Sequence, residues 1–350
     1  MASMRDVAAA AGVSVSTVAA VINNNKYVSP DLAKRVNEAI KATKYVRPDQ
    51  LAAVAEAAQR DKMVAVILPG VYSSFFPPLL NGITDMASSK DIPVLLMDSK
   101  RSFSREKELM ERAASYGIRQ FILDSVCDIR NEEAYFGSIR KEYIEERGAR
   151  VVVVERSVRD DAFSCVSVDN YAAAYQAAEH LIELGCRHPA HISGASQFPH
   201  AKIREEAFCQ CLRDHGVEID RRRILRGDFT PLSGFSSIHF LLENGIEVDG
   251  VFAANDQMAI GAMKALLSSG LRIPDDCAVV GFDDLPVSSL VTPSLSTIHY
   301  PVYQMGYRAM EMLSAPREAG RPDSCKLDCR LVKRNSTIKN GPFDWELLGW

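Results

Sequence analysis

Polar residues end several apolar runs of the chain, at positions where they could bind a small molecule. These positions are Asp124-Ser125, Glu155-Arg156, Asn255-Asp256 and Asp283-Asp284. If the runs are parallel strands, their carboxyl ends meet along one edge of a sheet, which is where open α/β sheets bind ligands. Carboxylate and amide groups there would form hydrogen bonds with a polar ligand. For Asp284 an alternative stays open, because its side chain could instead cap the turn that follows it.

Catalytic and metal-binding chemistry has little support in the sequence. Two sets of Cys and His residues lie close together: Cys186, His188 and His191, and Cys209, Cys211 and His215. Neither set has the paired C-x-x-C spacing of a structural zinc site, and Cys209 and Cys211 would point about 200° apart on a helix. The sequence also lacks the G-x-S-x-G, Walker and G-x-G-x-x-G motifs. We therefore expect no metal site, no cofactor and no enzymatic activity.

Short hydroxyl and apolar side chains within the first 47 residues form a second set of candidate binding residues. Val18, Val21 and Ile22 have the spacing of the buried face of a helix. The outward face then carries Val15, Ser16, Thr17 and Ala20. Hydroxyl groups can bond to the phosphates or bases of DNA, and the methyl groups of the two apolar members can contact thymine. This face is the expected DNA-reading surface.

Three short helices are predicted to position that face. Gly12 supplies the permissive backbone of a tight turn after the first helix, and Ser14 can accept a hydrogen bond from the free N–H groups that begin the second. The third helix begins with Ser29 as cap and Pro30 at its first position. Helices joined in this way form a helix-turn-helix, whose second helix enters the major groove of DNA. We assign residues 1–47 to this domain.

The charge distribution supports contact between this domain and nucleic acid. The chain carries a net charge of −4, which by itself argues against DNA binding. Residues 1–47 contain seven basic and three acidic residues, however, so their net charge is +4 and that of the remainder is −8. A small basic domain on an acidic body is the pattern expected of a protein whose head alone contacts phosphates.

From residue 63 onward, apolar runs with the length of strands alternate with amphipathic helices. The predicted strands are Met63–Leu68, Pro93–Asp98, Gln120–Leu123, Val151–Val154, Cys165–Val168, Ala190–Ser193, Ile224–Arg226, Gly250–Ala253 and Ala278–Gly281. The predicted helices include Pro78–Lys90, Arg105–Tyr116, Tyr171–Leu184, Ile203–His215, Gly234–Glu243 and Asp256–Ser269. Such alternation indicates parallel sheets covered by helices, and more than eight strands suit two sheets better than one.

Length and composition fit a soluble protein of the cell interior. With 350 residues, 47% of them hydrophobic and 25% charged, the chain can bury a substantial core. No apolar run reaches the length of a membrane span, and the N-terminus lacks a signal-peptide pattern, so we expect a cytoplasmic protein that does not contact membranes. The eight cysteines are scattered, as expected of buried side chains rather than disulfides.

Several short motifs in the first 48 residues follow one another at characteristic spacing. They are Asp6-Val7-Ala8, Gly12-Val13-Ser14, Thr17-Val18 and Val21-Ile22-Asn23, followed by Val28-Ser29, Tyr45 and Pro48. This series resembles the lactose-repressor family of bacterial transcription regulators. The resemblance implies that the second helix contacts DNA through Ser14, Val15, Ser16, Thr17, Ala20 and Asn23.

Motifs in the rest of the chain continue the resemblance. They include Ser74-Phe75-Phe76, Val168-Asp169-Asn170, the segments 180–185, 252–256 and 279–284, Thr292-Pro293 and Thr297-Ile298. The resemblance implies a sensor with the periplasmic sugar-binding-protein fold, in which three crossovers join two lobes. We place the crossovers near residues 161, 292 and 322. The expected fold is thus a small all-α head followed by a two-lobed α/β domain with two parallel sheets.

The resemblance also implies a set of effector-binding residues. Arg204, Asn255 and Asp283 match an arginine, an asparagine and an aspartate that bind effectors in the family. The remaining expected pocket residues are Phe229, which matches a stacking aromatic, and Glu155, Tyr72 and Phe76. Together these groups suit a polyhydroxylated ligand, and we expect a sugar or a sugar derivative.

Two of these assignments have structural alternatives, and the pocket departs from the family pattern. Arg204 could form a surface ion pair with Glu205 or Asp214, and Phe229 could simply pack in the core. Glu155 replaces the usual aspartate, residues 69–72 lack the common aspartate, and Ala207 replaces a glycine. We therefore expect a ligand other than the familiar galactosides and purines.

The linker between head and body departs from the family as well. Residues 48–61 are alanine-rich and are predicted to form a hinge helix, followed by the effector-binding, dimerising domain 62–340 and a tail 341–350. Family members insert a leucine from this helix into the minor groove. That position is Ala55 here, with Val54 beside it, and Ala20 stands where long base-reading side chains are usual.

These features together predict a ligand-responsive transcription regulator. We expect a repressor that binds a pseudo-palindromic DNA operator as a homodimer and that a sugar-like effector controls. The alternative is a cytosolic small-molecule binding protein whose DNA affinity is weakened, an interpretation that Ala20 and Ala55 favour.

Overall fold

The chain divides into two compact units, residues 1–61 and 62–350. The computed structural model describes residues 2–23, 25–43, 45, 62–315 and 323–339. The expected hinge helix 48–61 and the tail 341–350 lie outside the described residues. Within them no single helix is long and apolar enough to cross a membrane, although the bent pair Met4–Ala11 and Val15–Asn23 reaches that length and composition when taken together.

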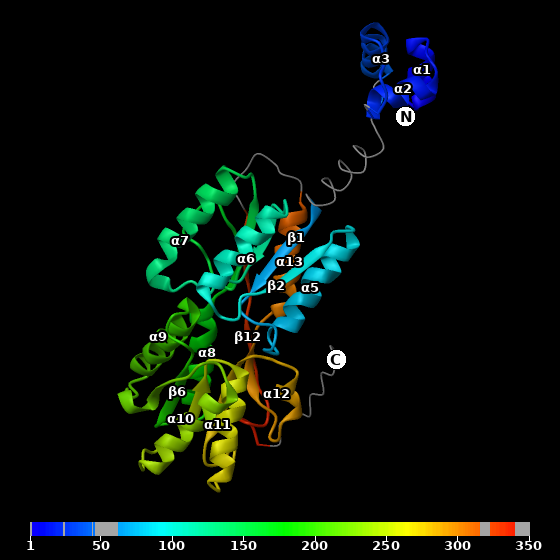
Figure 1. Ribbon diagram of the computed structural model, residues 1–350. Helices are drawn as coiled ribbons and strands as arrows, with labels where there is room; N and C mark the ends of the chain where they lie inside the picture. Colours follow the sequence, from blue (N-terminus) through cyan, green and yellow to red (C-terminus); the bar gives the residue numbers. More distant parts are fainter. Residues whose placement is uncertain (1, 24, 44, 46–61, 316–322, 340–350) are drawn as a thin grey trace. The chain divides into compact units, whose positions relative to one another are not determined.

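The first unit contains the expected helix-turn-helix, made of α1 (Met4–Ala11), α2 (Val15–Asn23) and α3 (Pro30–Thr43) (Figure 1). Ser3 and Asp6 close a capping box at the start of α1. Gly12 ends that helix with a φ of 63°, a left-handed conformation that favours glycine. The helices enclose a small apolar core: Val7, Ala8, Ala11, Val18, Val36 and Ala39.

The second unit contains two six-stranded sheets, as expected from the alternating pattern. The first sheet has the order β11 (Ser324–Leu327), β5 (Ser164–Val168), β4 (Arg150–Val154), β3 (Gln120–Leu123), β1 (Val64–Leu68) and β2 (Val94–Asp98). The second has the order β12 (Arg330–Val332), β10 (Ser296–His299), β9 (Ala278–Asp283), β8 (Gly250–Ala253), β6 (Pro189–Ser193) and β7 (Ile224–Arg226). All pairs are parallel except β10 with β12.

Helices cover both faces of each sheet. In the first lobe they are α5 (Phe76–Ser89), α6 (Phe103–Ser115), α7 (Glu132–Ile139) and α13 (Val302–Ser314). In the second lobe they are α8 (Asn170–Glu183), α9 (Pro199–Asp214), α10 (Pro231–Glu243), α11 (Asp256–Ser268) and α12 (Val287–Leu290). The short segments are η1 (Ile129–Asn131), η2 (Arg140–Glu145) and η3 (Arg221–Arg223).

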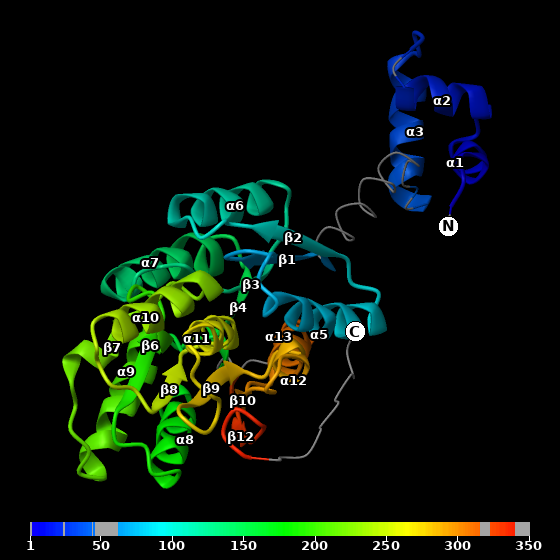
Figure 2. The same ribbon diagram turned by 90° about the horizontal axis from the view of Figure 1, so that it is seen from below.

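Successive side chains of a strand point to opposite faces of the sheet, which explains this layered packing. In β1, Val64, Val66 and Leu68 belong to the apolar cluster that includes α5 and α13 residues, while Ala65 and Ile67 belong to the one formed with α6 and α7. Figure 2 shows these two helix pairs on opposite sides of the sheet. Because a strand with both faces covered must be apolar throughout, such strands appear in the sequence as short continuous apolar runs.

The chain passes between the lobes three times, later than expected each time. It stays in the first sheet through Val168 and in the second through His299, and it returns from the first sheet after Leu327. The crossovers expected near 161, 292 and 322 are therefore wrong by several residues. The reason is that β5 and β10 must complete their pairing with β4 and β9 before the chain can leave.

Candidate ligand pocket and DNA-reading face

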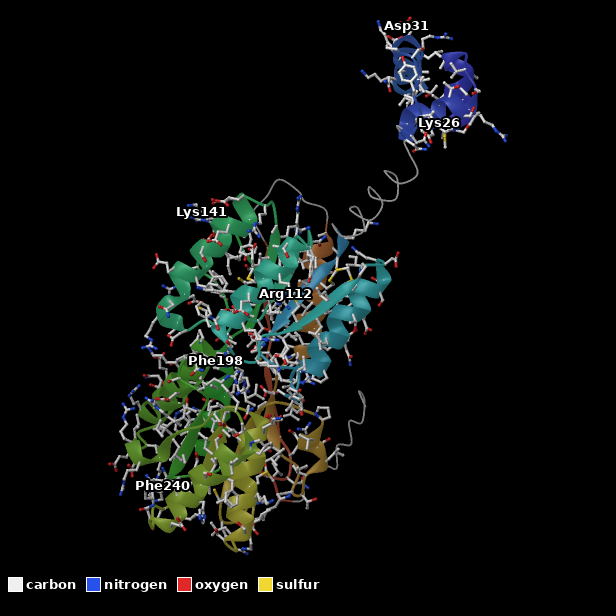
Figure 3. The ribbon with its side chains drawn as sticks, in the orientation of Figure 1. Lys26, Asp31, Arg112, Lys141, Phe198 and Phe240 are labelled. Carbon is white, nitrogen blue, oxygen red and sulfur yellow. The ribbon has the colours of Figure 1, made fainter. Side chains whose placement is uncertain are left out.

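A pocket lies between the two lobes, at the carboxyl ends of strands from both sheets. Its empty space, counting the part that is open to solvent, is about 640 Å³. The first lobe contributes Pro69, Ser73, Phe75, Phe76, Arg101, Asp124 and Glu155. The second lobe contributes Phe198, His200, Arg204, Phe229, Asn255 and Asp283. Figure 3 shows Phe198 in the region where the lobes meet.

Arg204 is a buried member of this pocket. Its side chain projects from α9, and the residue is 3% exposed. Its Nε donates to Asn170 Oδ1 at 2.9 Å, its Nη1 donates to the Ala254 carbonyl at 2.6 Å, and its guanidinium lies 3.6 Å from the centre of the Phe282 ring. The alternative of a surface ion pair with Glu205 or Asp214 is therefore wrong.

Asn255 and Phe229 are joined by a hydrogen bond at the wall of the pocket. Asn255 caps α11 by accepting from the Met258 N–H at 2.9 Å, and its amide nitrogen donates to the Phe229 carbonyl at 3.2 Å. The Phe229 ring lies 6.0 Å from Phe198 and 5.5 Å from His200, measured between ring centres. Phe229 therefore lines the pocket and also packs against its apolar surroundings, so the two interpretations of this residue are compatible.

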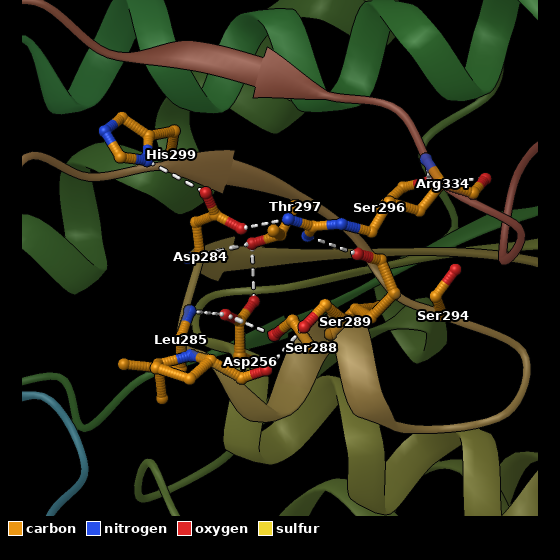
Figure 4. Close-up of polar contacts among 12 residues, drawn as sticks. Asp256, Asp284, Leu285, Ser288, Ser289, Ser294, Ser296, Thr297, His299 and Arg334 are labelled. Atoms are coloured by element: carbon orange, nitrogen blue, oxygen red, sulfur yellow. Dashed lines mark hydrogen bonds and ion pairs between the residues drawn. The ribbon is translucent and has the colours of Figure 1, made fainter. Parts of the chain in front are cut away.

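Asp283 and Asp284 adopt positive φ angles of 117° and 56° at the end of β9. A hydrogen-bonded network holds this turn (Figure 4). Asp284 accepts from His299 Nδ1 at 2.9 Å and pairs with Arg334 Nη2 at 2.8 Å. Although burial opposes them, these two partners lower the pKa of Asp284 overall. Because its carboxylate is bound by His299 and Arg334, and the Leu285 N–H donates to Asp256 instead, the alternative that Asp284 caps the following turn is wrong.

Asp256 supports the same turn from the start of α11. Its carboxylate is fully buried and accepts from the Leu285 N–H at 2.7 Å, from Ser288 Oγ at 2.8 Å and from Thr297 Oγ1 at 2.5 Å. Burial raises the pKa of Asp256 to about 7. Sequence reasoning named this residue only as the neighbour of Asn255, because nothing local shows that it reaches the turn after β9.

Three further carboxylates line the pocket and are almost fully buried. Asp124 and Glu155 are each 8% exposed and Asp283 is 7% exposed. Burial raises the pKa of all three, and the negative charge of Glu155 adds to the rise at Asp124 and Asp283. Asp124 and Glu155 belong to the first lobe and Asp283 to the second, and all three line the same pocket.

All of the expected pocket residues except Tyr72 line the pocket. Arg204, Phe229, Asn255, Asp283, Glu155 and Phe76 all line the pocket. Tyr72 does not, because the chain bends between residues 71 and 75 and leaves its ring 91% exposed. Sequence reasoning missed Phe198 and His200. A usable signal was present, since His200 precedes Arg204 by four residues and so lies on the same face of α9.

The start of α2 presents the expected hydroxyl groups. Ser14 Oγ accepts from the Thr17 N–H at 3.1 Å and lies 2.7 Å from Ser16 Oγ. Val15 is 42% exposed, and Asn23 is also exposed.

Ala20 and two linker residues complete the set of expected DNA contacts. Ala20 is only 8% exposed, so its expected outward position is wrong. Val18 and Ala20 are the buried residues of α2. Val54 and Ala55 lie outside the described residues. Within the described part of the chain, no group of three or more His, Cys, Asp or Glu side chains is arranged to hold a metal ion.

Comparison with known proteins agrees with both units. Residues 3–48 match the model of bacterial regulatory proteins of the lacI family, and residues 178–337 match a periplasmic binding protein-like domain. The ribose operon repressor of Halalkalibacterium halodurans is 32% identical over 96% of this chain and 97% of its own. The transcriptional regulator AscG of Escherichia coli is 32% identical over 97% of this chain and 99% of its own.

Solved structures share the arrangement. A transcriptional regulator CelR–cellobiose complex superposes with a TM-score of 0.71 at 28% identity, covering 96% of this chain and 100% of the other. A lac repressor dimer bound to operator has the same fold, with a TM-score of 0.72 at 23% identity over 96% of this chain and 99% of the other. The chain therefore belongs to the lacI family of bacterial regulatory proteins, and it is a DNA-binding transcriptional regulator.

Proposed function

We propose that this regulator is a cytoplasmic repressor controlled by a sugar or sugar derivative that binds in the pocket between the lobes. The observation that carries the proposal is the convergence of buried polar groups on that pocket. Arg204 and Asn255 are 3% and 6% exposed, and they project from different elements into the same pocket. In the described part of the chain the hydrogen bonds of Arg204 come from Nε and Nη1, so further N–H groups of its guanidinium can donate to the hydroxyl groups of a ligand.

The names of similar proteins support this choice of effector class. One relative is a ribose operon repressor, and one similar structure is a complex with cellobiose. We propose that Phe229 packs against the apolar face of the bound ring while Arg204, Asn255 and Asp283 bind its polar groups. The relatives are regulators, and we propose that this chain likewise acts by binding and not by catalysis.

On the DNA side, we propose that two chains form a homodimer and bind two related half-sites of an operator. The contacts to bases and phosphates come from Ser14, Val15, Ser16, Thr17 and Asn23 at the start and end of α2. Two exposed hydroxyl groups beside a helix N-terminus suit a phosphate, because the free N–H groups there also favour anions. Effector binding is coupled to DNA binding through the linker 48–61, as two sites on one bistable molecule.

Recovery of DNA by the purified full-length protein tests the proposal. The chain is incubated with random genomic fragments of its bacterial host, and the retained fragments are sequenced. A repressor should enrich a pseudo-palindromic motif near promoters, and binding should weaken as salt rises. Recovery of no preferred sequence would instead support a small-molecule binding protein with weakened DNA affinity. The buried Ala20 is the observation that favours this second candidate.

A further inference from the structure

Arg204 and Asp283 line the pocket from the second lobe, and each is hydrogen-bonded to a segment that crosses between the lobes. Arg204 Nε donates to Asn170 Oδ1 at 2.9 Å. Asn170 is the first residue of α8, and β5 of the first lobe ends at Val168, so Asn170 lies where the first crossover enters the second lobe. The residue is only 7% exposed, so water competes little for this bond.

Asp283 is joined to the second crossover through its backbone. Its carbonyl accepts from the Tyr300 N–H at 3.4 Å, and it pairs with His299 in the register of β9 and β10. His299 is the last residue of β10, and the chain then passes through Tyr300 into α13 of the first lobe. The ring centre of Tyr300 lies 5.7 Å from that of Phe75, which lines the pocket from the first lobe. The second crossover therefore contacts pocket residues of both lobes.

Asp284, the neighbour of Asp283, extends this link to the third crossover. Its carboxylate accepts from His299 Nδ1 at 2.9 Å and pairs with Arg334 Nη2 at 2.8 Å (Figure 4). Arg334 follows β12, the strand with which the chain enters the second lobe after the third crossover, and its Nη1 donates to the Leu295 carbonyl at 3.0 Å. The side chains of Asp284 and Arg334 are 8% and 5% exposed. A buried ion pair thus holds the turn after β9 against the segment that follows the third crossover.

These bonds link the positions of two pocket residues to the conformation of the crossovers. The angle between the lobes depends on the crossovers, because they are the covalent connections between the lobes. A ligand that is held by both lobes favours one angle over others, and it shifts this equilibrium only through such differential contacts. Side chains that join a pocket residue to a crossover are therefore contacts through which the ligand and the angle between the lobes influence each other.

We propose that Asn170 and Asp284 are positioning residues that couple ligand binding in the pocket to the orientation of the lobes. Neither residue lines this pocket. Asn170 acts through Arg204, and Asp284 acts through Asp283, because each holds its pocket residue in a fixed position relative to a crossover. This inference rests on the proposed function, since it requires a ligand in the pocket that changes the affinity for operator DNA.

Operator binding by the full chain, measured with and without a bacterial metabolite extract that raises Tm, tests the inference. The extract should change the affinity of the wild-type protein for its recovered operator by about 5–150-fold, the usual range of allosteric coupling. In Asn170→Ala, Arg204 keeps its bond to the Ala254 carbonyl. The rise in Tm should therefore persist, while the change in operator affinity is lost. Asn170→Asp keeps an acceptor for Arg204 and should restore that change.

A second variant and a matched control accompany this pair. Asp284→Asn keeps the shape of the side chain but removes the charge that pairs with Arg334, so it should also reduce the effect of the extract on operator affinity. The control is Lys326→Ala. Lys326 Nζ pairs with Asp169 Oδ2 at 2.6 Å and so joins the first and third crossovers, but neither residue lines the pocket. Because this pair is exposed and screened by water, the control should respond to the extract as the wild type does.

The outcomes separate the coupling from the proposed function. A full change in operator affinity in both Asn170→Ala and Asp284→Asn would overturn the coupling role. Loss of the Tm rise together with that change in both variants would also overturn it, because the two residues would then merely maintain the ligand site. An equal loss of the change in Lys326→Ala would show that the links to the pocket are not what matters. A wild-type protein whose Tm or operator affinity does not respond to any extract would contradict the proposed function itself.

Discussion

The turn at Asp283 and Asp284 shows how the protein places a binding side chain against its local preference. Residues other than glycine rarely adopt positive φ, and each such residue costs on the order of 1–3 kcal/mol. Two sets of contacts offset that cost: Asp256 accepts from the Leu285 N–H just after the turn, and His299 and Arg334 bind the Asp284 carboxylate. Asp283 is thereby held with its carboxylate toward the pocket, although it accepts no hydrogen bond of its own among the described residues.

Asp283→Ala should separate ligand binding from stability. The change removes a buried carboxylate whose pKa burial has raised, so Tm should stay the same or rise. The Tm increase caused by a stabilising metabolite extract should disappear, and binding to recovered operator DNA should persist. Arg204→Ala should also abolish the response, whereas Glu146→Ala should retain it. An undiminished response in both pocket variants would mean that the effector binds elsewhere.

Asp256 should give the second lobe a measurable pH dependence. Burial raises its pKa to about 7 in the folded protein, from an ordinary value of 3.8. A carboxyl group with a raised folded pKa stabilises the fold below its unfolded pKa, and this contribution is lost as pH rises through the folded pKa. Wild-type stability should therefore fall between about pH 4 and pH 7 relative to Asp256→Asn, by roughly 1–4 kcal/mol. Tm measured across this range for both proteins checks the sign; parallel curves would contradict the raised pKa.

At the scale of elements, each lobe contains a pair of helices that contact each other at a glycine. A Cβ on Gly306 of α13 would lie 2.0 Å from the Leu79 carbonyl oxygen of α5, and one on Gly261 of α11 would lie 1.9 Å from the Pro231 carbonyl oxygen of α10. Real side chains never approach backbone so closely, so both crossings depend on the missing Cβ. In each lobe, therefore, a glycine allows two helices to pack closely against each other.

Gly306→Ala and Gly261→Ala should each destabilise the body by forcing these helices apart. Overpacking of this kind typically costs about 1–3 kcal/mol, which lowers Tm by roughly 2–10 °C in a domain of this size. Gly137→Ala on α7 is a matched control, since a Cβ there would meet no atom within 4 Å. The interpretation is wrong if all three variants melt alike.

The elements that the sequence predicted well are those with a clear local signal. The strands β3, β7 and β8 lie where the apolar runs placed them, and the neighbouring helices differ by a few residues at their ends. The strands β11 and β12 were missed, because their residues are exposed or half-buried and show no apolar face. The helix α13 was not predicted either, although Val302, Met305 and Ala309 form a buried stripe on it.

Side chains of the site were predictable where a motif fixed their position and less so where tertiary structure did. Arg204, Asn255 and Asp283 followed from strand ends and family motifs. Asp124 was also named at a strand end, but its place in the same pocket as Asp283 was not predictable, because the two residues lie at the ends of strands in different sheets and only the meeting of the lobes brings them into one pocket. The exposure of Tyr72 and the burial of Ala20 likewise depend on packing that no local pattern records.

At the scale of the whole molecule, the head and the rest of the chain carry opposite net charges. The head carries +4 and the remainder −8. Neutralisation of phosphates dominates the affinity of most proteins for DNA, so affinity should reside in the head, while the acidic body should repel the duplex.

A chain that begins at Met63 should therefore bind no DNA but keep its fold and its response to metabolites. Electrophoretic shift with operator fragments measures the first property, and thermal unfolding with and without metabolite extract measures the second. The full chain at the same concentration is the control. Retention of operator affinity by the shortened chain would show that the division between DNA-binding head and sensor body is incorrect.

The last two strands in the described part of the chain, β11 and β12, are edge strands of the first and second sheets, and only Asp328 and Cys329 separate them. Together they shield the unpaired backbone groups of β5 and β10, which would otherwise recruit strands from other molecules. A chain that ends at residue 322 should thus expose the unpaired backbone groups of both β5 and β10. It should aggregate with added β-structure rather than merely melt earlier, and light scattering at temperatures below Tm would reveal this.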